Sequence, residues 1–349
     1  MRETSDVRIA RSQPLVTPKE LASEFPIDEN ASEFVWQSRR QIEAIVSGED
    51  NRLLCIVGPC SVHDTAALLD FAVGFKEGTA DLKDAILPVL RVYFEKPRSV
   101  IGWKGLINDP DLDSSFHISK GLRLARELLI KVAELELPVA TEFLDTTFGQ
   151  YYADLISFGA IGARTVESQV HRELASGLSM PVGFKNATSG DISVAIDAIR
   201  SAAHAHWFPS LTPDGEPAVL ESTGNPHAYL ILRGGKDSGP NYQASHIRAA
   251  AAALHSQELP ESLIVDCSHG NSEKNHERQL DVASDLAGQI TSGEPAIRGI
   301  MMESHLVAGQ QSIDASPLTY GQSITDACLA LPETLAALQT LAEAVKKKT

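Results

Sequence analysis

The feature that most constrains the fold of this sequence is a series of eight short apolar runs separated by helix-like segments. Each run has the length and the apolar or β-branched composition of a buried strand. The predicted strands are 53–57, 88–94, 138–143, 160–164, 181–185, 228–233, 262–266 and 299–303. Strands that alternate with helices build parallel sheets, so the pattern predicts an α/β protein with a (β/α)8 TIM barrel. An open, doubly wound sheet is the structural alternative.

The segments between the strands complete this domain organisation. The predicted helices are 65–76, 119–134, 148–157, 192–203, 243–256, 276–289 and 332–346. Residues 1–50 are more polar and contain a capped helical start at Thr17 and a helix end at Gly48, so we expect an N-terminal helical arm. We expect residues 51–349 to form the barrel. An insert at 209–226, rich in Pro, Gly, Thr and Ser, predicts a β-hairpin before the sixth strand.

The charge and the hydropathy exclude several classes of protein. The formal net charge is −16, which argues against nucleic acid or an anionic membrane as the main partner. The apolar runs are far shorter than the roughly 20 residues that span a bilayer, and the N-terminus lacks the apolar core of a signal peptide. We therefore expect a cytoplasmic protein, in which four scattered cysteines suit packing, metal binding or catalysis.

Polar residues end or follow every predicted strand, at the face where TIM barrels carry their chemistry. Six of them are cationic: Arg91, Lys96, Arg98, Arg164, Lys185 and Arg233. Guanidinium groups bind phosphate and carboxylate oxygens in pairs, and lysine adds a point charge. Taken singly, each could be a solvated loop residue. Together they are more than one phosphate group needs, so they predict two anionic substrates or one substrate with several anionic groups.

A second set combines a thiol, an imidazole and two carboxylates: Cys60, His269, Glu303 and Asp326. This mixture favours Mn, Fe, Co or Zn over Mg or Ca. The four residues form no compact motif, so the prediction depends on their convergence at the barrel mouth. Cys60 could instead be a small core residue. Asp326 could instead be the N-cap of the last helix.

Several longer motifs resemble one family. They are the segments 58–61 (GPCS), 91–98 (RVYFEKPR), 102–106 (GWKGL), 162–165 (GART), 181–186 (PVGFKN) and 323–327 (SITDA). Together they resemble type I 3-deoxy-D-arabino-heptulosonate 7-phosphate (DAHP) synthase, and the likeness runs nearly end to end. Two departures keep the charge unchanged, namely Ser99 in place of a common Thr and Ala187 in place of a common Gly.

The resemblance implies condensation of phosphoenolpyruvate with D-erythrose 4-phosphate and water, with release of phosphate, as the first step of the shikimate pathway. It implies that Arg98 and Ser99 hold the phosphate of erythrose 4-phosphate, and that Cys60, His269, Glu303 and Asp326 bind a divalent transition metal, with Mn favoured. It assigns phosphoenolpyruvate and the neighbouring substrate contacts to Arg91, Lys96, Gly162, Ala163, Arg164, Lys185, Arg233 and Asp326.

For the chemical step, we expect a metal ion to polarise the aldehyde oxygen as a Lewis acid. Lys96 is the candidate proton donor to the developing alkoxide, and His269 completes the catalytic set. Glu142 is expected to position the attacking water, or else to orient the cations as a salt-bridge partner. Cys328 follows Asp326 by two residues, so its oxidation with Cys60 is expected if the mouth brings the two thiols together.

The family resemblance also implies feedback inhibition by an aromatic amino acid. The matching effector wall comprises Gln150, Leu174, Leu178, Ser179, Phe208 and Ser210. The residues around Thr17 and Gln150 look most like Trp-inhibited members, so Trp is favoured over Tyr or Phe. A covering arm or a second subunit could equally bury this wall. We expect a homodimer or homotetramer in which residues 1–50 serve assembly and regulation.

Three rival functions remain open on the sequence. A Schiff-base aldolase would use Lys185 as its nucleophile but would leave the metal set without a role. A related synthase could use another aldose phosphate, such as arabinose 5-phosphate. A metal or sugar-phosphate sensor would bind without catalysis.

Overall fold

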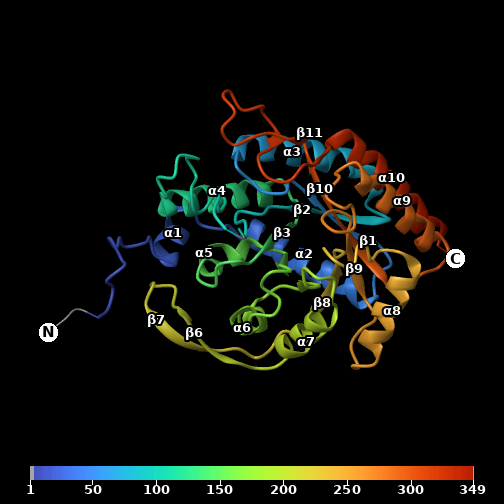
Figure 1. Cartoon of the computed structure of the whole chain (residues 1–349), viewed down its shortest axis with the longest axis horizontal. Helices are drawn as coiled ribbons and strands as arrows, with labels where there is room; N and C mark the ends of the chain where they lie inside the picture. The colour runs from blue at the N-terminus through green and yellow to red at the C-terminus, as the bar shows by residue number, and fades with distance from the viewer. Residues whose placement is uncertain (1–3, 99, 349) are drawn as a thin grey trace.

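The computed structural model describes residues 4–98 and 100–348, whose parallel strands close into a barrel (Figure 1). The strands are β1 (Leu53–Gly58), β2 (Ile86–Arg91), β3 (Val139–Glu142), β4 (Phe158–Ile161), β5 (Val182–Lys185), β8 (Ala228–Leu232), β9 (Leu263–Asp266) and β10 (Ile297–His305), in that spatial order. The first strand pairs with β10 as well as with β2, which places Cys55 opposite both Ile300 and Pro88. This closure confirms the predicted TIM barrel and excludes the open sheet.

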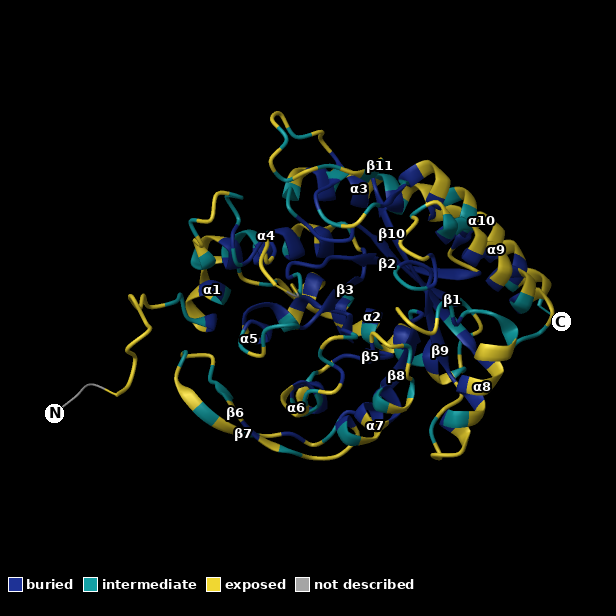
Figure 2. Ribbon diagram, viewed as in Figure 1, coloured by how far each residue is buried: buried dark blue, intermediate teal, exposed yellow. Residues whose placement is uncertain are grey.

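Two apolar layers follow from the alternation of side chains along each strand. Leu54 and Ile56 of β1 belong to an inner cluster with residues such as Val89 and Ile231. Cys55 and Val57 belong to the outer cluster beneath the surrounding helices. Both faces of the strands are therefore buried, as Figure 2 shows, which explains why the sequence has continuous apolar runs here.

Helices cover the outside of the barrel. They are α3 (Thr65–Gly78), α4 (Ile118–Glu134), α5 (Gly149–Tyr152), α6 (Gln169–Gly177), α7 (Ser193–Ala202), α8 (Ala244–His255), α9 (Arg278–Thr291) and α10 (Leu331–Lys347). The predicted helix at 148–157 is a short α5 followed by a 3-10 turn, Ala153–Leu155. Helix α6 was missing from the sequence prediction because it has only nine residues, and only two of its buried residues, Leu174 and Ala175, are apolar. No helix among the described residues is long and apolar enough to cross a membrane.

The N-terminal arm contains α1 (Pro18–Glu24) and α2 (Glu29–Ser47). Thr17 and Glu20 form the expected capping box of α1, and Gly48 ends α2 in the left-handed conformation. Ile42, Ile45 and Val46 of α2 join the inner apolar cluster of the barrel. Helix α2 therefore covers the end of the barrel opposite the carboxyl ends of the strands.

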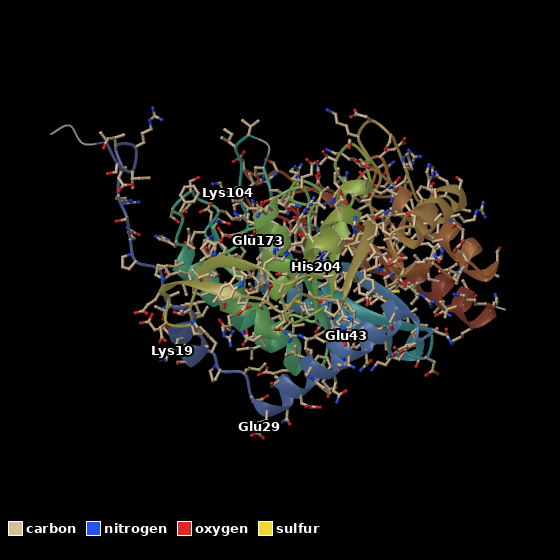
Figure 3. All side chains as sticks on the ribbon, turned by 90° about the horizontal axis from the view of Figure 1, so that it is seen from below. Lys19, Glu29, Glu43, Lys104, Glu173 and His204 are labelled. Atoms are coloured by element: carbon tan, nitrogen blue, oxygen red, sulfur yellow. The ribbon has the colours of Figure 1, made fainter. Side chains whose placement is uncertain are left out.

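The predicted insert forms the antiparallel hairpin β6 (Trp207–Leu211) and β7 (Pro217–Glu221), which begins two residues before the expected boundary. Its turn contacts the arm. The backbone N–H of Lys19 donates to Pro213 O at 2.8 Å, and the Lys19 ammonium pairs with Asp214 at 2.8 Å. Figure 3 shows Lys19 at the hairpin end of the molecule. Arm and insert thus form one continuous surface feature.

The chain after β10 contains three short strands that the sequence patterns did not predict, β11 (Val307–Gln310), β12 (Gln322–Ser323) and β13 (Leu329–Ala330). Strand β13 pairs with the end of β10, placing Ser304 opposite Leu329. Helix α10 begins only at Leu331, with Ala330 at its N-cap. The alternative role of Asp326 as the N-cap of the last helix is therefore wrong, and its side chain is available at the barrel mouth.

Candidate active site

The strand register itself brings the predicted site residues together. Side chains two positions apart point to the same face, so the residue that follows an inner-cluster residue by two also points inward. Arg91 follows Val89 in this way, and Glu303 follows Met301. Glu142, Arg233 and Asp266 likewise follow an inner-cluster residue of their own strand by two positions. One ring of charged groups therefore lies directly above the apolar interior.

Three predicted metal ligands meet at this ring. A ligand atom each from Cys60, Glu303 and Asp326 lies within 4.8 Å of the other two. The Cys60 Sγ is 3.6 Å from Asp326 Oδ2. Burial, with the nearby Glu303 charge, raises the pKa of the Cys60 thiol, and Lys96 opposes that rise from 3.0 Å away.

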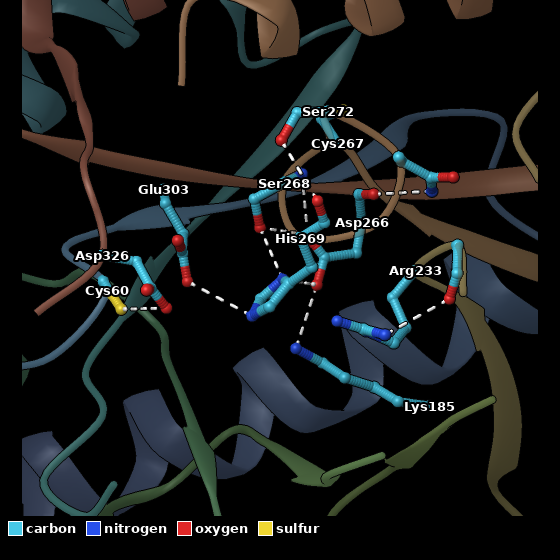
Figure 4. A network of polar contacts seen from close by, with 12 residues as sticks. Cys60, Lys185, Arg233, Asp266, Cys267, Ser268, His269, Ser272, Glu303 and Asp326 are labelled. Atoms are coloured by element: carbon cyan, nitrogen blue, oxygen red, sulfur yellow. Dashed lines mark hydrogen bonds and ion pairs between the residues drawn. The ribbon is translucent and has the colours of Figure 1, made fainter. Parts of the chain in front are cut away.

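His269 lies beside this group, as Figure 4 shows. Its Nε2 is 3.7 Å from Glu303 Oε1, and its Nδ1 is 3.0 Å from Asp266 Oδ2. The backbone of His269 is held at a φ of 58°, which L-residues seldom adopt and which often marks functional sites. His269 therefore offers its free ring nitrogen toward the other three predicted ligands.

Two donor pairs have the spacing that one ion requires, although His269 lies outside the group of three donors that are mutually within 4.8 Å. Ligands about 2.2 Å from a tetrahedral metal ion lie about 3.6 Å from one another. The Cys60–Asp326 and His269–Glu303 separations are 3.6 and 3.7 Å. A thiol, an imidazole and two carboxylates also match the transition metals better than Mg or Ca.

Arg91 is the most buried cation of the ring. Its guanidinium pairs with Glu303 at 2.9 Å, donates to Pro59 O at 3.1 Å, and lies 3.5 Å from the centre of the Tyr93 ring. Its Nη1 is buried without a hydrogen-bond partner in the described part of the chain. A buried donor without an acceptor is costly, so this nitrogen is suited to an anionic substrate atom.

Two more cations of the ring lie on the far side from Cys60. Lys185 pairs with Asp266 at 2.9 Å, and both side chains are almost fully buried. Arg233 is half-buried, and its Nη1 donates to Gly234 O at 3.3 Å. Burial, supported by the like charge of Arg164, lowers the pKa of Arg233, although Asp266 opposes the effect.

A cleft of about 1010 Å³ opens beside the ring and is lined by Lys96, Arg98 and Arg164 among others. Arg98 is exposed and donates from Nε to Trp103 O at 2.7 Å. Arg164, predicted at the end of a strand, instead lies in the turn after β4 because this strand ends at Ile161. The predicted contact Ser99 lies outside the described residues.

Glu142 is buried at the end of β3, close to the predicted contact Gly162, and the predicted contact Ala163 lies in the turn after β4. A side chain added at Gly162 would place its Cβ 2.4 Å from Glu142 Oε1, so the Glu142 carboxyl group would have to move from its present position. Nearby, burial and the adjacent Asp145 raise the pKa of Glu95 to about 8. Glu95 therefore carries a proton in the cleft near neutral pH.

The predicted effector residues divide into two places. Phe208 and Ser210 of β6 lie along α6, where Phe208 faces Gly177 and Leu174 is buried. Leu178 and Ser179 follow directly in the chain. Ser210 Oγ is buried and has no hydrogen-bond partner in the segments that the structure covers. Gln150 instead lines a cavity of about 350 Å³ that lies between the arm, α5 and the hairpin turn.

Two residues of the site were not predicted as functional. The sequence analysis treated Asp266 only as the end of a strand. Its acidic side chain at an inward position, close to Ser268 and His269 in the sequence, could have indicated a role in the site. Glu95 was seen only as part of a motif, and its raised pKa depends on tertiary burial. The predicted pair Cys60 and Cys328 does lie close together, because the Cys60 N–H points at the Cys328 Sγ from 3.4 Å.

A parallel barrel whose mouth joins metal-competent side chains to a ring of cations defines a class of enzyme that acts on anionic substrates. The family model described as "DAHP synthetase I family" matches residues 24–339. The chain is 52% identical over 346 residues to the Trp-sensitive phospho-2-dehydro-3-deoxyheptonate aldolase of Escherichia coli, with 99% of each chain covered. It is 50% identical over 347 residues to the Phe-sensitive enzyme of that organism, again with 99% of each chain covered.

A solved structure of a phospho-2-dehydro-3-deoxyheptonate aldolase from Francisella tularensis has the same fold. Its TM-score is 0.96 at 50% sequence identity, covering 98% of this chain and 99% of the other. The chain therefore belongs to the DAHP synthetase I family and is an enzyme of this class.

Proposed function

We propose that this enzyme condenses phosphoenolpyruvate with D-erythrose 4-phosphate and water to give DAHP and phosphate, using a metal centre at the barrel mouth. The observation that carries the proposal is the ring of inward-facing charges, in which Arg91 lies beside the Cys60, Glu303 and Asp326 cluster and Lys185 lies across the ring from it. Anion binding and metal binding thus share one rim.

In this proposal the two anionic substrates divide the mouth between them. Phosphoenolpyruvate is bound by Arg91, Lys96, Arg164, Lys185 and Arg233, with the buried Nη1 of Arg91 donating to one of its oxygens. Arg98 binds the phosphate of erythrose 4-phosphate in the adjacent cleft, which holds both molecules at a fixed separation. Such positioning lowers the entropic part of the barrier.

Cys60, His269, Glu303 and Asp326 would hold the ion. When bound, the ion supplies Lewis-acid polarisation of the aldehyde oxygen. Carbon 3 of phosphoenolpyruvate then forms a bond to the aldehyde carbon, and Lys96 protonates the resulting alkoxide. Water oriented by Glu142 adds to carbon 2 and gives up one proton, which restores the Lys96 ammonium. The bond from carbon 2 to the phosphate oxygen then breaks, and phosphate leaves with the hydroxyl proton as the ketone of DAHP forms.

The surroundings of Lys185 favour this mechanism over a Schiff-base aldolase. Burial alone would lower its pKa, but Asp266 at 2.9 Å and the nearby Tyr93 raise it. A lysine that remains protonated cannot act as an amine nucleophile. Lys185 is therefore suited to holding an anion.

The test is the release of inorganic phosphate from the purified protein. Release should require both substrates and Mn²⁺, and a chelator should abolish it. Cys60→Ala should lose this activity and the stoichiometric metal, whereas Cys55→Ala, a buried thiol in the outer layer of the barrel, should retain both. Full activity of Cys60→Ala with metal still bound would contradict the metal assignment. Equal rates with arabinose 5-phosphate would contradict the assignment of the sugar substrate.

We also propose feedback inhibition by an aromatic amino acid, with Trp preferred over Tyr and Phe. Leu174, Leu178 and Phe208 would contact the aromatic ring, and Ser179 and Ser210 would bind its polar groups. The contact between the arm and the hairpin turn supports a regulatory and assembly role for residues 1–50 in a homodimer or homotetramer. Inhibition titrations with the three amino acids, together with light scattering, test these assignments.

A further inference from the structure

One buried carboxylate connects the two halves of the mouth. Asp266 Oδ2 lies 2.9 Å from Lys185 Nζ and 3.0 Å from His269 Nδ1. Its other oxygen accepts from the Ser268 backbone N–H at 3.0 Å and from the Ser268 hydroxyl at 2.5 Å. Asp266 is fully buried, so water does not compete for these contacts. Figure 4 shows Asp266 between Lys185 and His269.

These contacts favour the His269 tautomer that is protonated at Nδ1. The Ser268 hydroxyl donates its hydrogen to Asp266 Oδ1, so its oxygen accepts from His269 Nδ1, 2.7 Å away. Asp266 Oδ2 is a second acceptor at the same nitrogen. With Nδ1 protonated, Nε2 keeps its lone pair on the side of Glu303, 3.7 Å away. A carboxylate that orients an imidazole in this way raises its basicity toward a metal ion.

Lys185 and His269 share one oxygen of Asp266, so a change in either bond affects the other. When Lys185 turns its charge toward a bound anion, the negative charge of Asp266 acts more fully on the His269 N–H. When Nε2 binds a cation, the Nδ1–H becomes more acidic and bonds Asp266 more strongly, which releases Lys185 toward the anion. Both ligands therefore favour the same distribution of charge around Asp266.

We infer that Asp266 is a positioning residue that couples metal binding at His269 to phosphoenolpyruvate binding at Lys185. The inference rests on the proposed function, since it takes the two ligands from there. Coupling free energies are reciprocal, so each ligand should increase the affinity for the other by the same factor. Part of this factor comes from the direct attraction between cation and anion, and Asp266 supplies the remainder.

Equilibrium titration without erythrose 4-phosphate measures this factor without turnover. Mn²⁺ affinity is determined from the free-ion EPR signal, with and without saturating phosphoenolpyruvate, in the full-length protein. Asp266→Asn should bind Mn²⁺ about 10–100-fold more weakly, as is typical when an outer-shell carboxylate is removed. Its coupling factor should also fall at least about fivefold, the lower end of typical allosteric coupling.

Ser268→Ala is the matched control, because it removes one acceptor of His269 Nδ1 and one donor to Asp266 Oδ1 but keeps the pair between Asp266 Oδ2 and Lys185. It should weaken Mn²⁺ binding but keep a coupling factor within about twofold of the wild-type value. A coupling factor in Asp266→Asn equal to that of the wild type would overturn the inference. A wild-type protein that binds neither ligand would instead count against the proposed function.

Nitrogen-15 NMR of labelled histidine provides a readout that does not depend on the folding of a variant. In the metal-free wild-type protein, the His269 resonance, assigned with His269→Gln, should show the tautomer protonated at Nδ1. A His269 protonated at Nε2 would overturn the inference, because the ring would then present a hydrogen toward the metal side.

Discussion

Replacing Glu303 with Gln should separate two roles of this carboxylate, metal binding and the neutralisation of a buried cation. Arg91 and Glu303 are paired at 2.9 Å with side-chain exposures of only 1% and 3%. Removing one member of a buried pair costs about 3–5 kcal/mol, because the remaining charge is left without compensation. In Glu303→Gln, the new amide carbonyl can still accept a hydrogen bond from Arg91, and Arg91 keeps its contacts with Pro59 O and the Tyr93 ring. We therefore expect the free energy of unfolding to fall by the lower value of this range, about 3 kcal/mol.

The assay is urea unfolding followed by tryptophan fluorescence, with a chelator present so that metal binding does not contribute. Asp326→Asn is the matched control, since it removes another predicted ligand whose residue is exposed. It should lose metal affinity but change the free energy of unfolding by less than about 1 kcal/mol. Arg91→Met combined with Glu303→Gln should recover much of the loss, because no buried charge is left unpaired. Equal stabilities of Glu303→Gln and the wild type would refute this reasoning.

The remaining predictions concern the cleft, the effector wall and the thiols. The proton bound to Glu95 stabilises the folded state fully below about pH 4.5, and this contribution is lost as the pH rises through about 8. Between these values, the free energy of unfolding of the wild type should therefore fall by about 1.4 kcal/mol per pH unit because of Glu95. Glu95→Gln should remove this part of the pH dependence from the unfolding curves. Gly162→Ala should displace the Glu142 carboxyl group and lower kcat about tenfold or more, with metal content unchanged in elemental analysis. Phe208→Ala should raise the half-inhibitory concentration of the effector about tenfold while phosphate release without effector stays at the wild-type rate, and an unchanged titration would exclude this wall. A redox-active metal should inactivate the enzyme through a Cys60–Cys328 disulfide, and recovery with a thiol reductant is expected; inactivation that no reductant reverses would count against it.

The barrel could be predicted because its information is local and periodic. Runs such as 53–57 are apolar on both faces, and most of them are followed by a recognisable helix and by a polar residue at the same end. The pairing of β1 with β10 joins residues almost 250 positions apart, and only the count of eight strands predicted it. Short elements were less accessible. Strands β12 and β13 have two residues each, too few for a period to be recognised.

The candidate site, like the fold, could be predicted only in part from the sequence. The residue types at the strand ends indicated the chemistry, but the motifs and the resemblance were needed to assign a role to each one. Asp266 shows what sequence alone does not provide, because its importance comes from sharing one oxygen between Lys185 and His269. The raised pKa of Glu95 likewise depends on burial beside Asp145, a residue 50 positions away. Such properties arise only from the folded arrangement.

The central claim is that one ion binds at the barrel mouth between residues from four separate segments. Anomalous diffraction from crystals grown with Mn²⁺ and phosphoenolpyruvate tests it most directly. We expect one strong peak about 2.0–2.4 Å from Cys60 Sγ, His269 Nε2 and an oxygen each of Glu303 and Asp326. A peak at another location, or a mouth without a peak at saturating Mn²⁺, would contradict the claim.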